Sequence, residues 1–235
     1  MNANLSRVPI TKQAVFKVLK TTLKWIGYAH LVLFILIGVF AIYYINNNPS
    51  FTTLMWYRSE FKSTETPSFV PLRKVSPTFL LDLTNREDAR FYEHWGFDIE
   101  AIKTARDLNK KAGYRAYGGS TLTQQLARTL FLTPHKNYLR KYLELLIAVE
   151  LELILGKERI LELYINYAEL GDQVYGFNDA SKHYYKRSFL KTTKDQKLRL
   201  IALLASPIRY SPYTLHKNRH LTKRYNFLKK YHKVH

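Results

Sequence analysis

The sequence of 235 residues contains no cysteine. This excludes a disulfide framework and a thiolate metal site, and it leaves the redox compartment open. Acidic residues are also scarce, because 18 Asp and Glu stand against 37 Lys and Arg, for a formal net charge of +19. Such a balance favours polyanionic partners: nucleic acid, an anionic membrane surface or phosphorylated substrates. The hydrophobic fraction of 46% is ordinary and argues against wholesale disorder.

One apolar run stands out near the N-terminus. Residues 25–45 contain no Asp, Glu, Lys or Arg, and about 20 apolar residues are enough to cross a bilayer as a helix. Several cations and no acid precede this run, whereas only Arg58 follows it closely. The positive-inside rule therefore predicts a transmembrane helix at 25–45, with residues 1–24 as a cytoplasmic segment and 46–235 outside the cytoplasm. A cleaved signal peptide is the alternative, but the apolar core is long and no small-residue cleavage site follows it.

The rest of the chain predicts a mainly α-helical domain. Residues 46–75 lack a clear period and are interpreted as a linker and membrane-proximal segment. From Ser76 the pattern is helical, since Ser76 can cap a helix that has Pro77 at its first position. The main domain is therefore predicted at 76–235.

Capping residues mark the next helices. Asp98 can cap a helix that Gly113 ends, and the Gly-rich turn at 117–120 leads to Thr121 and Gln124 at the spacing of a capping box.

A buried helix is predicted at 137–155. Gly156 ends it, and a helical period resumes at 157–166. No convincing strand run is visible. The tail at 216–235 is rich in Lys and Arg and has no acid, which predicts a last helix with a solvated basic face. Contact of this tail with anionic lipid headgroups is the alternative.

A carboxylate cluster lies on this basic chain at residues 85–98, NREDARFYEHWGFD, and includes Glu87. It is either a solvated turn or the site of a general base whose substrate is held by cations elsewhere.

Two further stretches carry weaker signals. The turn at 117–120 leads into a helix N-terminus, which favours anions but is a weak signal alone. Arg140 and Glu144 form an i, i+4 pair, which in most proteins is a surface ion pair.

Taken together, these stretches resemble the ordered motifs of the peptidoglycan glycosyltransferases, family 51. The similarity covers roughly residues 70–215. The matching segments are, in order, Glu87-Asp88-x-x-Phe91-x-x-His94-x-Gly96, Gly118-Gly119-Ser120-Thr121-Leu122-Thr123-Gln124-Gln125, Arg140-Lys141-x-x-Glu144, Lys157-x-x-Ile160-Leu161-x-x-Tyr164-x-Asn166, and Tyr175-Gly176 with Ala180 and Tyr184-Tyr185.

The resemblance implies a lysozyme-like glycosyltransferase domain at 76–235 with one N-terminal transmembrane helix, in the monofunctional branch that lacks a penicillin-binding domain. It implies that Glu87 is the general base and Glu144 the second essential carboxylate, whereas Asp88 and Glu93 are structural or electrostatic. The substrate-binding residues that it implies are Ser120, Gln125, Arg128, Lys136, Arg140 and Lys141.

This chain departs from the usual family pattern at positions next to these residues. Arg128 stands where Lys is usual, Thr129 where Asn is usual and Lys136 where Arg is usual. Both charge exchanges keep the cation, although Arg binds as a fork and Lys as a point charge.

The implied reaction joins lipid II, as acceptor, to a growing glycan chain on undecaprenyl pyrophosphate, with inversion and formation of a β-1,4 link. Elementary chemistry agrees, because an attacking hydroxyl needs a positioned carboxylate and a departing pyrophosphate needs cations. No cofactor is required and no metal ligand is assigned. A divalent cation, Mg²⁺ or Mn²⁺, near Glu144 is the alternative.

The resemblance also implies a place in the cell: the bacterial plasma (inner) membrane, crossed once, with the N-terminus cytoplasmic and the catalytic domain periplasmic. Wall-synthesis or division proteins are candidate further partners, and nucleic acid is not expected.

Three alternative functions compete with this one. A nucleic-acid-binding membrane protein would explain the charge but not the motifs. A lysozyme-like hydrolase would share the fold. An inactive wall-synthesis scaffold is a further alternative, which the intact Glu87, Gln125 and Glu144 argue against.

Overall fold

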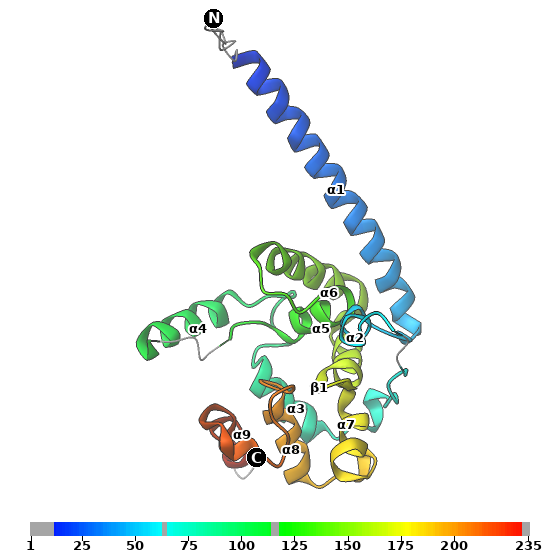
Figure 1. Cartoon of the computed structure of the whole chain (residues 1–235), viewed down its shortest axis with the longest axis vertical. Coiled ribbons are helices and arrows are strands. Elements are labelled where there is room, and N and C mark those ends of the chain that lie inside the picture. The colour runs from blue at the N-terminus through cyan, green and yellow to red at the C-terminus, as the bar shows by residue number, and fades with distance from the viewer. Residues whose placement is uncertain (1–11, 63–64, 114–117, 232–235) are drawn as a thin grey trace, which may run out of the picture.

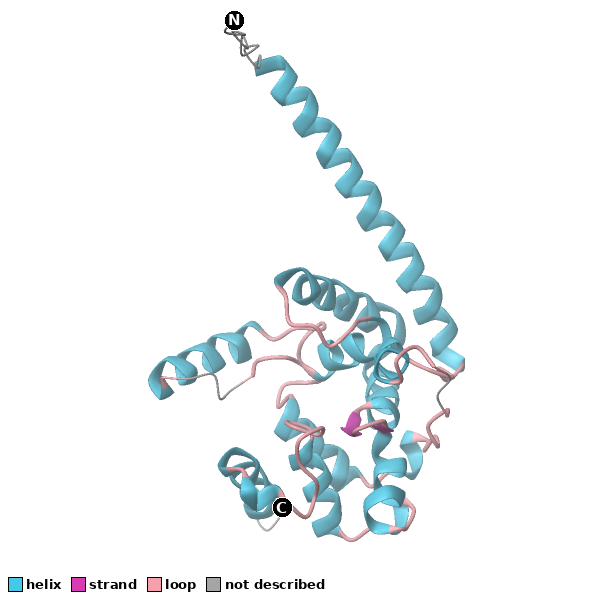
Figure 2. Ribbon diagram, viewed as in Figure 1, coloured by secondary structure: helices cyan, strands magenta, loops and turns pink. Residues whose placement is uncertain are grey.

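The computed structural model describes residues 12–62, 65–113 and 118–231. A long N-terminal helix projects from a helical domain (Figure 1 and Figure 2). Residues 1–11 of the N-terminal segment, Tyr117 of the Gly-rich turn and the last residues of the basic tail lie outside the described residues. The elements are α1 (Lys12–Asn46), α2 (Thr53–Arg58), η1 (Leu72–Lys74), α3 (Pro77–Glu87), α4 (Ile99–Ala112), α5 (Leu122–Phe131), α6 (Tyr138–Tyr167), β1 (Glu169–Gly171), β2 (Val174–Tyr175), α7 (Gly176–Tyr185), η2 (Phe189–Lys191), α8 (Lys194–Leu203), η3 (Leu215–Lys217) and α9 (Arg219–Tyr231).

Helix α1 contains the predicted membrane span. Its 35 residues, at about 1.5 Å per residue, reach farther than the roughly 30 Å of a hydrocarbon core. Only Ile37, Gly38 and Ala41 are buried along it. The C-terminal end of α1 is tied to the domain by Arg159 of α6, which donates to the carbonyls of Tyr44 and Asn47, each at 2.7 Å. An exposed apolar helix held in this way fits a single-pass membrane anchor.

The predicted helix caps are confirmed. Ser76 caps α3, with Pro in the first turn, and Asp98 caps α4. Gly113 ends α4 in the left-handed conformation, and Thr121 with Gln124 forms a complete capping box at the start of α5. These features are local, since each cap satisfies backbone N–H groups within a few residues of itself.

Helix α6 bends where the sequence predicts a break. Gly156 has φ 71° and ψ 166°, a conformation that residues with a Cβ rarely adopt, and the helix continues beyond it to Tyr167. The prediction of two helical segments joined at Gly156 is therefore confirmed.

Two features escaped the sequence patterns. Strands β1 and β2 form a small antiparallel hairpin of three and two residues, too short to show an alternating pattern. Helix α2 lies inside the segment 46–75 and is too short to show a helical period. Leu54, Met55 and Val70 from this segment are buried in the core of the domain, so the membrane-proximal residues pack with the helices that follow.

Helices α5 and α6 pack against each other in the core, which also takes residues from α3, α7, α8 and α9. Leu122, Leu126 and Leu130 line the buried face of α5, as their spacing predicts, and pack with α6 residues such as Ile147 and Leu151. The fold is mainly α, as the sequence predicts, and the pairing of α5 with α6 brings the second and third motifs together.

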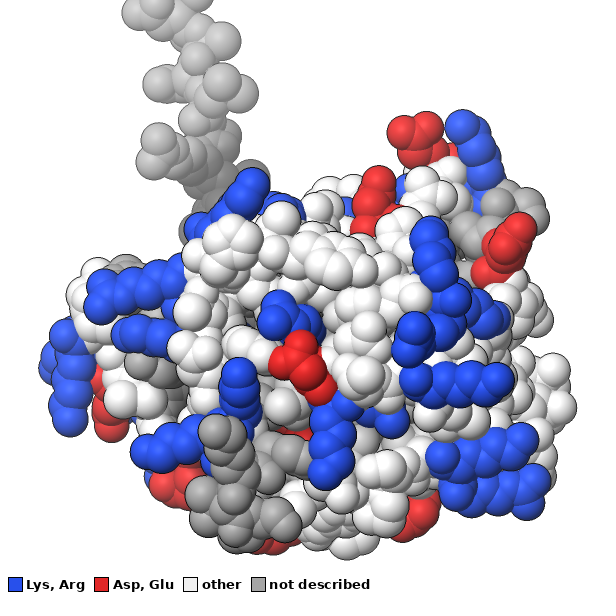
Figure 3. All heavy atoms as spheres, turned by 90° about the horizontal axis from the view of Figure 1, so that it is seen from below, with Lys and Arg blue, Asp and Glu red and all other residues white. Residues whose placement is uncertain are grey.

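Helix α9 packs on α3 and α8, at the opposite end of the molecule from the N-terminus of α1 (Figure 1). The face of the domain at this end carries many Lys and Arg side chains (Figure 3). Lys223, Lys229 and Lys230 are exposed, as predicted for a solvated basic face. That prediction is wrong for Arg224, which is only 8% exposed, because it lies on the inward face of α9 between Leu221 and Leu228.

Candidate active site

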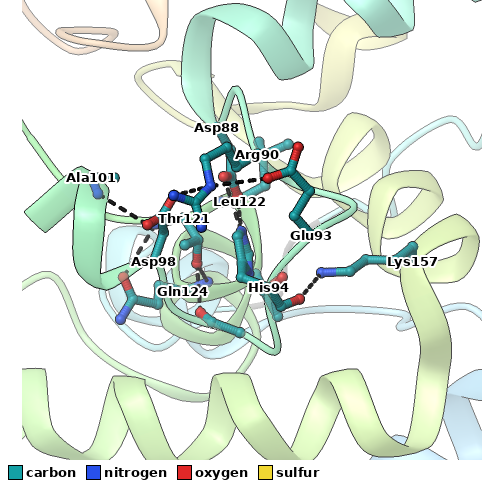
Figure 4. A network of polar contacts seen from close by, with 12 residues as sticks. Asp88, Arg90, Glu93, His94, Asp98, Ala101, Thr121, Leu122, Gln124 and Lys157 are labelled. Atoms are coloured by element: carbon teal, nitrogen blue, oxygen red, sulfur yellow. Dashed lines mark hydrogen bonds and ion pairs between the residues drawn. The ribbon is translucent and has the colours of Figure 1, made fainter.

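The carboxylate turn at 85–98 is fixed from within by Asp88 and His94, which are both buried (Figure 4). Nε2 of His94 lies 3.0 Å from each oxygen of the Asp88 carboxylate. Oδ2 of Asp88 also accepts a hydrogen bond from the backbone N–H of Leu122 at 2.9 Å, at the start of α5. Asp88 thus joins the first motif to the second.

Gly96 lets this turn approach α6 closely. Its φ is 89°, and a Cβ at this position would lie 2.8 Å from the backbone of Ala148. The hydroxyl of Thr121 donates to the carbonyl of Gly96 at 2.7 Å, and Lys157 donates to the carbonyl of His94. The turn is therefore held between α5 and α6 (Figure 4), and only glycine fits at its point of closest approach.

Glu87 is the last residue of α3, and its side chain is 9% exposed. Oε1 accepts a hydrogen bond from Nη2 of Arg224, and Oε2 accepts one from Nε2 of Gln125 at 3.3 Å. The carboxylate is therefore held by α9 on one side and α5 on the other.

The amide of Gln125 is itself oriented. The hydroxyl of Tyr164 donates to its Oε1 at 2.9 Å. Burial raises the pKa of Tyr164 well above its ordinary value, the charge of Glu87 adds to this, and the charges of Arg128 and Arg224 oppose it. Tyr164 thus stays protonated and able to donate. Arg128, which is half-buried, follows Gln125 by three residues on α5 and so lies on a neighbouring part of the same helix surface.

Glu144 forms a second charged cluster. The sequence alone favoured a surface ion pair with Arg140, but the Glu144 side chain is only 1% exposed. Arg140 donates to its Oε2 and Lys141 to its Oε1. Lys141 also donates to the hydroxyl of Ser120 at 2.8 Å. The third motif is thereby tied to the Gly-rich turn of the second.

The donor set around Glu144 does not suit a divalent cation. Both carboxylate oxygens already bind cationic side chains. Within the described ranges, no group of three or more His, Cys, Asp or Glu side chains could hold a metal ion. A hard cation such as Mg²⁺ or Mn²⁺ needs several oxygen ligands, so no step of the chemistry below is routed through a metal.

A cleft of about 480 Å³ is lined by one residue of each cluster, Glu87 and Ser120, whereas Arg140, Lys141 and Glu144 lie outside its lining. Its lining includes Glu87 and Asp88 together with Gly118, Gly119 and Ser120 of the Gly-rich turn. A buried carboxylate and a turn that carries a bound cation therefore face one space, which suits a substrate with a hydroxyl to deprotonate and an anionic group to hold.

Comparison with known proteins agrees with this geometry. Residues 56–232, most of the chain, match a family model described as Transglycosylase. The chain belongs to the transglycosylase family. It is therefore an enzyme, a glycosyltransferase of peptidoglycan synthesis, and its mainly α, lysozyme-like domain with one apolar N-terminal helix is the predicted fold.

Relatives of this transglycosylase are similar over most of their length. A biosynthetic peptidoglycan transglycosylase of Thiobacillus denitrificans is 36% identical over 202 residues, covering 80% of this chain and 87% of the relative. The protein of the same description from Laribacter hongkongensis is 36% identical over 225 residues, covering 88% and 98%. That from Caulobacter vibrioides is 42% identical over 140 residues, covering 60% and 61%.

The transglycosylase brings together most of the residues predicted for its site. Glu87 and Gln125 form one cluster, with the charge of Arg128 nearby, and Ser120, Arg140, Lys141 and Glu144 form the other. Lys136 is exposed in the loop before α6, and no contact in the described part of the chain ties it to either carboxylate.

Sequence reasoning missed two residues of the transglycosylase site. Tyr164 belongs to the fourth motif, but its contact with Gln125 could not be foreseen. Arg224 lies among the cations of the tail. One pattern in the sequence could have indicated that Arg224 points inward. Arg224 stands at i+3 between Leu221 at i and Leu228 at i+7, which is the spacing of one helix face.

Proposed function

We propose that this transglycosylase polymerises peptidoglycan glycan chains from lipid II by inverting glycosyl transfer. The observation that carries the proposal is the placement of Glu87. Its side chain is 9% exposed, and one of its carboxylate oxygens accepts only a long hydrogen bond among the described residues. Glu87 lines the same cleft as Ser120.

Glu87 takes the role of general base. The 4-hydroxyl of the acceptor sugar gives its proton to the Glu87 carboxylate, while the hydroxyl oxygen bonds to the anomeric carbon of the donor. The bond from that carbon to the pyrophosphate oxygen breaks, so inversion produces a β-1,4 link and releases undecaprenyl pyrophosphate. A carboxylate within reach of the attacking hydroxyl is what this reaction requires.

The second cluster takes the role of anion clamp. The Lys141 side chain is 43% exposed and can meet a ligand, whereas that of Glu144 is 1% exposed and cannot. Glu144 therefore positions Arg140 and Lys141, and the cations stabilise the negative charge of the departing pyrophosphate. Arg128 adds a cation near Glu87, and Lys136 supplies another from its exposed loop.

The anchor suits a substrate carried on a lipid. We place the N-terminus in the cytoplasm of a bacterial cell and the catalytic domain on the outer side of the plasma membrane, because several cations precede the span and only Arg58 follows it closely. The partners are then lipid II, the growing glycan chain and the membrane, and wall-synthesis proteins are candidates for further contacts.

Incubation of the purified full chain with labelled lipid II, followed by sizing of the product, tests the proposal. Polymerisation gives long glycan and undecaprenyl pyrophosphate. A lysozyme-like hydrolase would instead shorten preformed glycan, and an inactive scaffold would change neither substrate; either result would refute the proposal. Addition of EDTA should leave the rate unchanged, because the proposed chemistry needs no cofactor.

A further inference from the structure

We propose that Arg224, on helix α9, is a positioning residue for the transfer reaction: it holds Oε1 of Glu87 and leaves Oε2 as the oxygen that takes the proton. This inference rests on the proposed role of Glu87 as general base. It adds the last described helix to the catalytic machinery, which the motif pattern confines to residues before it.

The contact between the two residues is long-range and buried. Nη2 of Arg224 donates to Oε1 of Glu87 across 137 positions of the sequence, and both side chains are 9% exposed. Helix α9 reaches Glu87 because it packs on α3, whose last residue is Glu87. A charge-assisted hydrogen bond of this kind is about twice as strong as a neutral one and fixes direction as well as distance.

The two oxygens of Glu87 are not equivalent. Oε1 is engaged by a guanidinium, whereas the one partner of Oε2 among the described residues is a neutral amide N–H at 3.3 Å, beyond the usual range for such a bond. An incoming hydroxyl displaces the weaker contact more easily. With Oε1 held, the carboxylate cannot rotate freely, so Oε2 stays where the cleft can present a hydroxyl to it.

A buried arginine at position 224 costs folding free energy, and its contact with Glu87 offers a functional reason for that cost. Its Nε is buried without a hydrogen-bond partner among the described residues, which costs desolvation energy. A hydrophobic side chain between Leu221 and Leu228 would pack α9 at least as well, because buried ion pairs often stabilise less than apolar residues of similar volume. The contact with Glu87 gives a reason for the arginine that packing does not.

The test compares Arg224→Lys, Arg224→Met and Arg224→Ala in the full chain. Steady-state rates with labelled lipid II give kcat and KM, and thermal melting reports folding. Arg224→Met keeps the volume of the buried side chain if the Ala variant does not fold. We expect Met and Ala to lower kcat by roughly a hundredfold, the scale on which a misplaced catalytic group acts, with KM almost unchanged. Arg224→Lys should recover part of the loss.

Two controls separate positioning from stability. Lys223→Ala removes an exposed cation from the same helix, and Arg58→Ala removes a two-bond ion pair with Glu169 outside the cleft lining. Both should keep the wild-type kcat, even if Arg58→Ala lowers the melting temperature. In a Glu87→Gln background, Arg224→Met should cost little further activity, because Arg224 acts through the carboxylate.

The outcomes are distinct. Wild type without polymerisation refutes the proposed function itself. Active wild type together with a fully active, folded Arg224→Met refutes the positioning role and leaves the function standing. Loss of kcat in Arg58→Ala equal to that in Arg224→Met, at matched melting temperature, also refutes it, since instability alone would then explain the loss.

Discussion

The hydroxyl of Tyr164 donates a hydrogen bond to Oε1 of Gln125 at 2.9 Å and thereby turns the amide nitrogen of Gln125 toward Glu87. Tyr164 is 2% exposed and its pKa is raised well above the ordinary value, mainly by burial, so it acts as a donor. An amide has a donor end and an acceptor end. Tyr164 therefore determines that the amide nitrogen of Gln125, and not its oxygen, faces Glu87, the proposed base.

Tyr164→Phe should slow polymerisation roughly fivefold, the rate equivalent of one net hydrogen bond of about 1 kcal/mol. Tyr167→Phe is the matched control, because Tyr167 is also buried on α6 and donates to the carbonyl of Pro49 instead. Both variants should lose similar stability in thermal melts, but only the first should lose rate. Equal rates would show that the orientation of Gln125 is unimportant.

Glu87→Gln should reduce polymerisation by at least about a hundredfold, the usual scale for removal of a general base. The protein should remain folded with a lower melting temperature, because buried Arg224 loses its counter-charge. Glu93→Gln, an exposed carboxylate of the same turn, should behave as wild type. A fast Glu87→Gln enzyme would move the role of base to another carboxylate, with Asp88 as the next candidate.

Arg128→Lys should keep much of the activity, since charge matters more than residue identity if Arg128 contacts the pyrophosphate. Arg128→Ala should lose several kcal/mol of transition-state stabilisation, roughly 3 kcal/mol by analogy with loss of one oxyanion donor. The loss should fall in kcat more than in KM, because the charge develops as the leaving group departs. Arg187→Ala, which removes an exposed cation, is the control. An Ala variant as active as wild type would show that Arg128 is not one of the cations that stabilise the pyrophosphate.

Glu150 predicts a pH-dependent stability. It is 5% exposed, next to Gly38 of α1, and burial raises its pKa from 4.5 to about 7. The folded state therefore binds this proton more tightly than the unfolded state. Its stabilising contribution is complete below pH 4.5 and is lost as the pH rises through 7.

Glu150→Gln should therefore raise the melting temperature at pH 8 and change it little at pH 5. A tenfold change in proton affinity is worth about 1.4 kcal/mol, so the gain at pH 8 is at most about 3 kcal/mol. Glu158→Gln, an exposed carboxylate on the same helix, should show no such pH dependence. A variant less stable than wild type at pH 8 would contradict the prediction.

The topology can be read with reporter fusions. Alkaline phosphatase fused after His235 should be active, because that enzyme matures only outside the cytoplasm and the cations that flank the span closely lie mostly before it. The same reporter fused after Lys24 should be inactive. The reverse pair of results would invert the orientation proposed for the anchor.

The sequence by itself determined the local features of this protein. The caps at Ser76, Asp98 and Thr121 and the break at Gly156 were predictable, because each depends on neighbouring residues and on backbone conformation. The apolar span was predictable as well, since its length and composition alone make it suitable for a membrane. The order of the motifs pointed to Glu87 and Glu144 before any geometry was known.

Only the tertiary structure decided which distant side chains these residues contact. The tail containing Arg224 has the composition of a solvated helix, and the packing of α9 on α3 is what turns this one cation inward to Glu87. Glu144 has the spacing of a surface pair, and the α5–α6 contact is what buries it, while its partner Lys141 stays partly exposed and bonds to Ser120. Pairings across many residues depend on how helices pack, and neither composition nor periodicity records which face of a helix finds a partner.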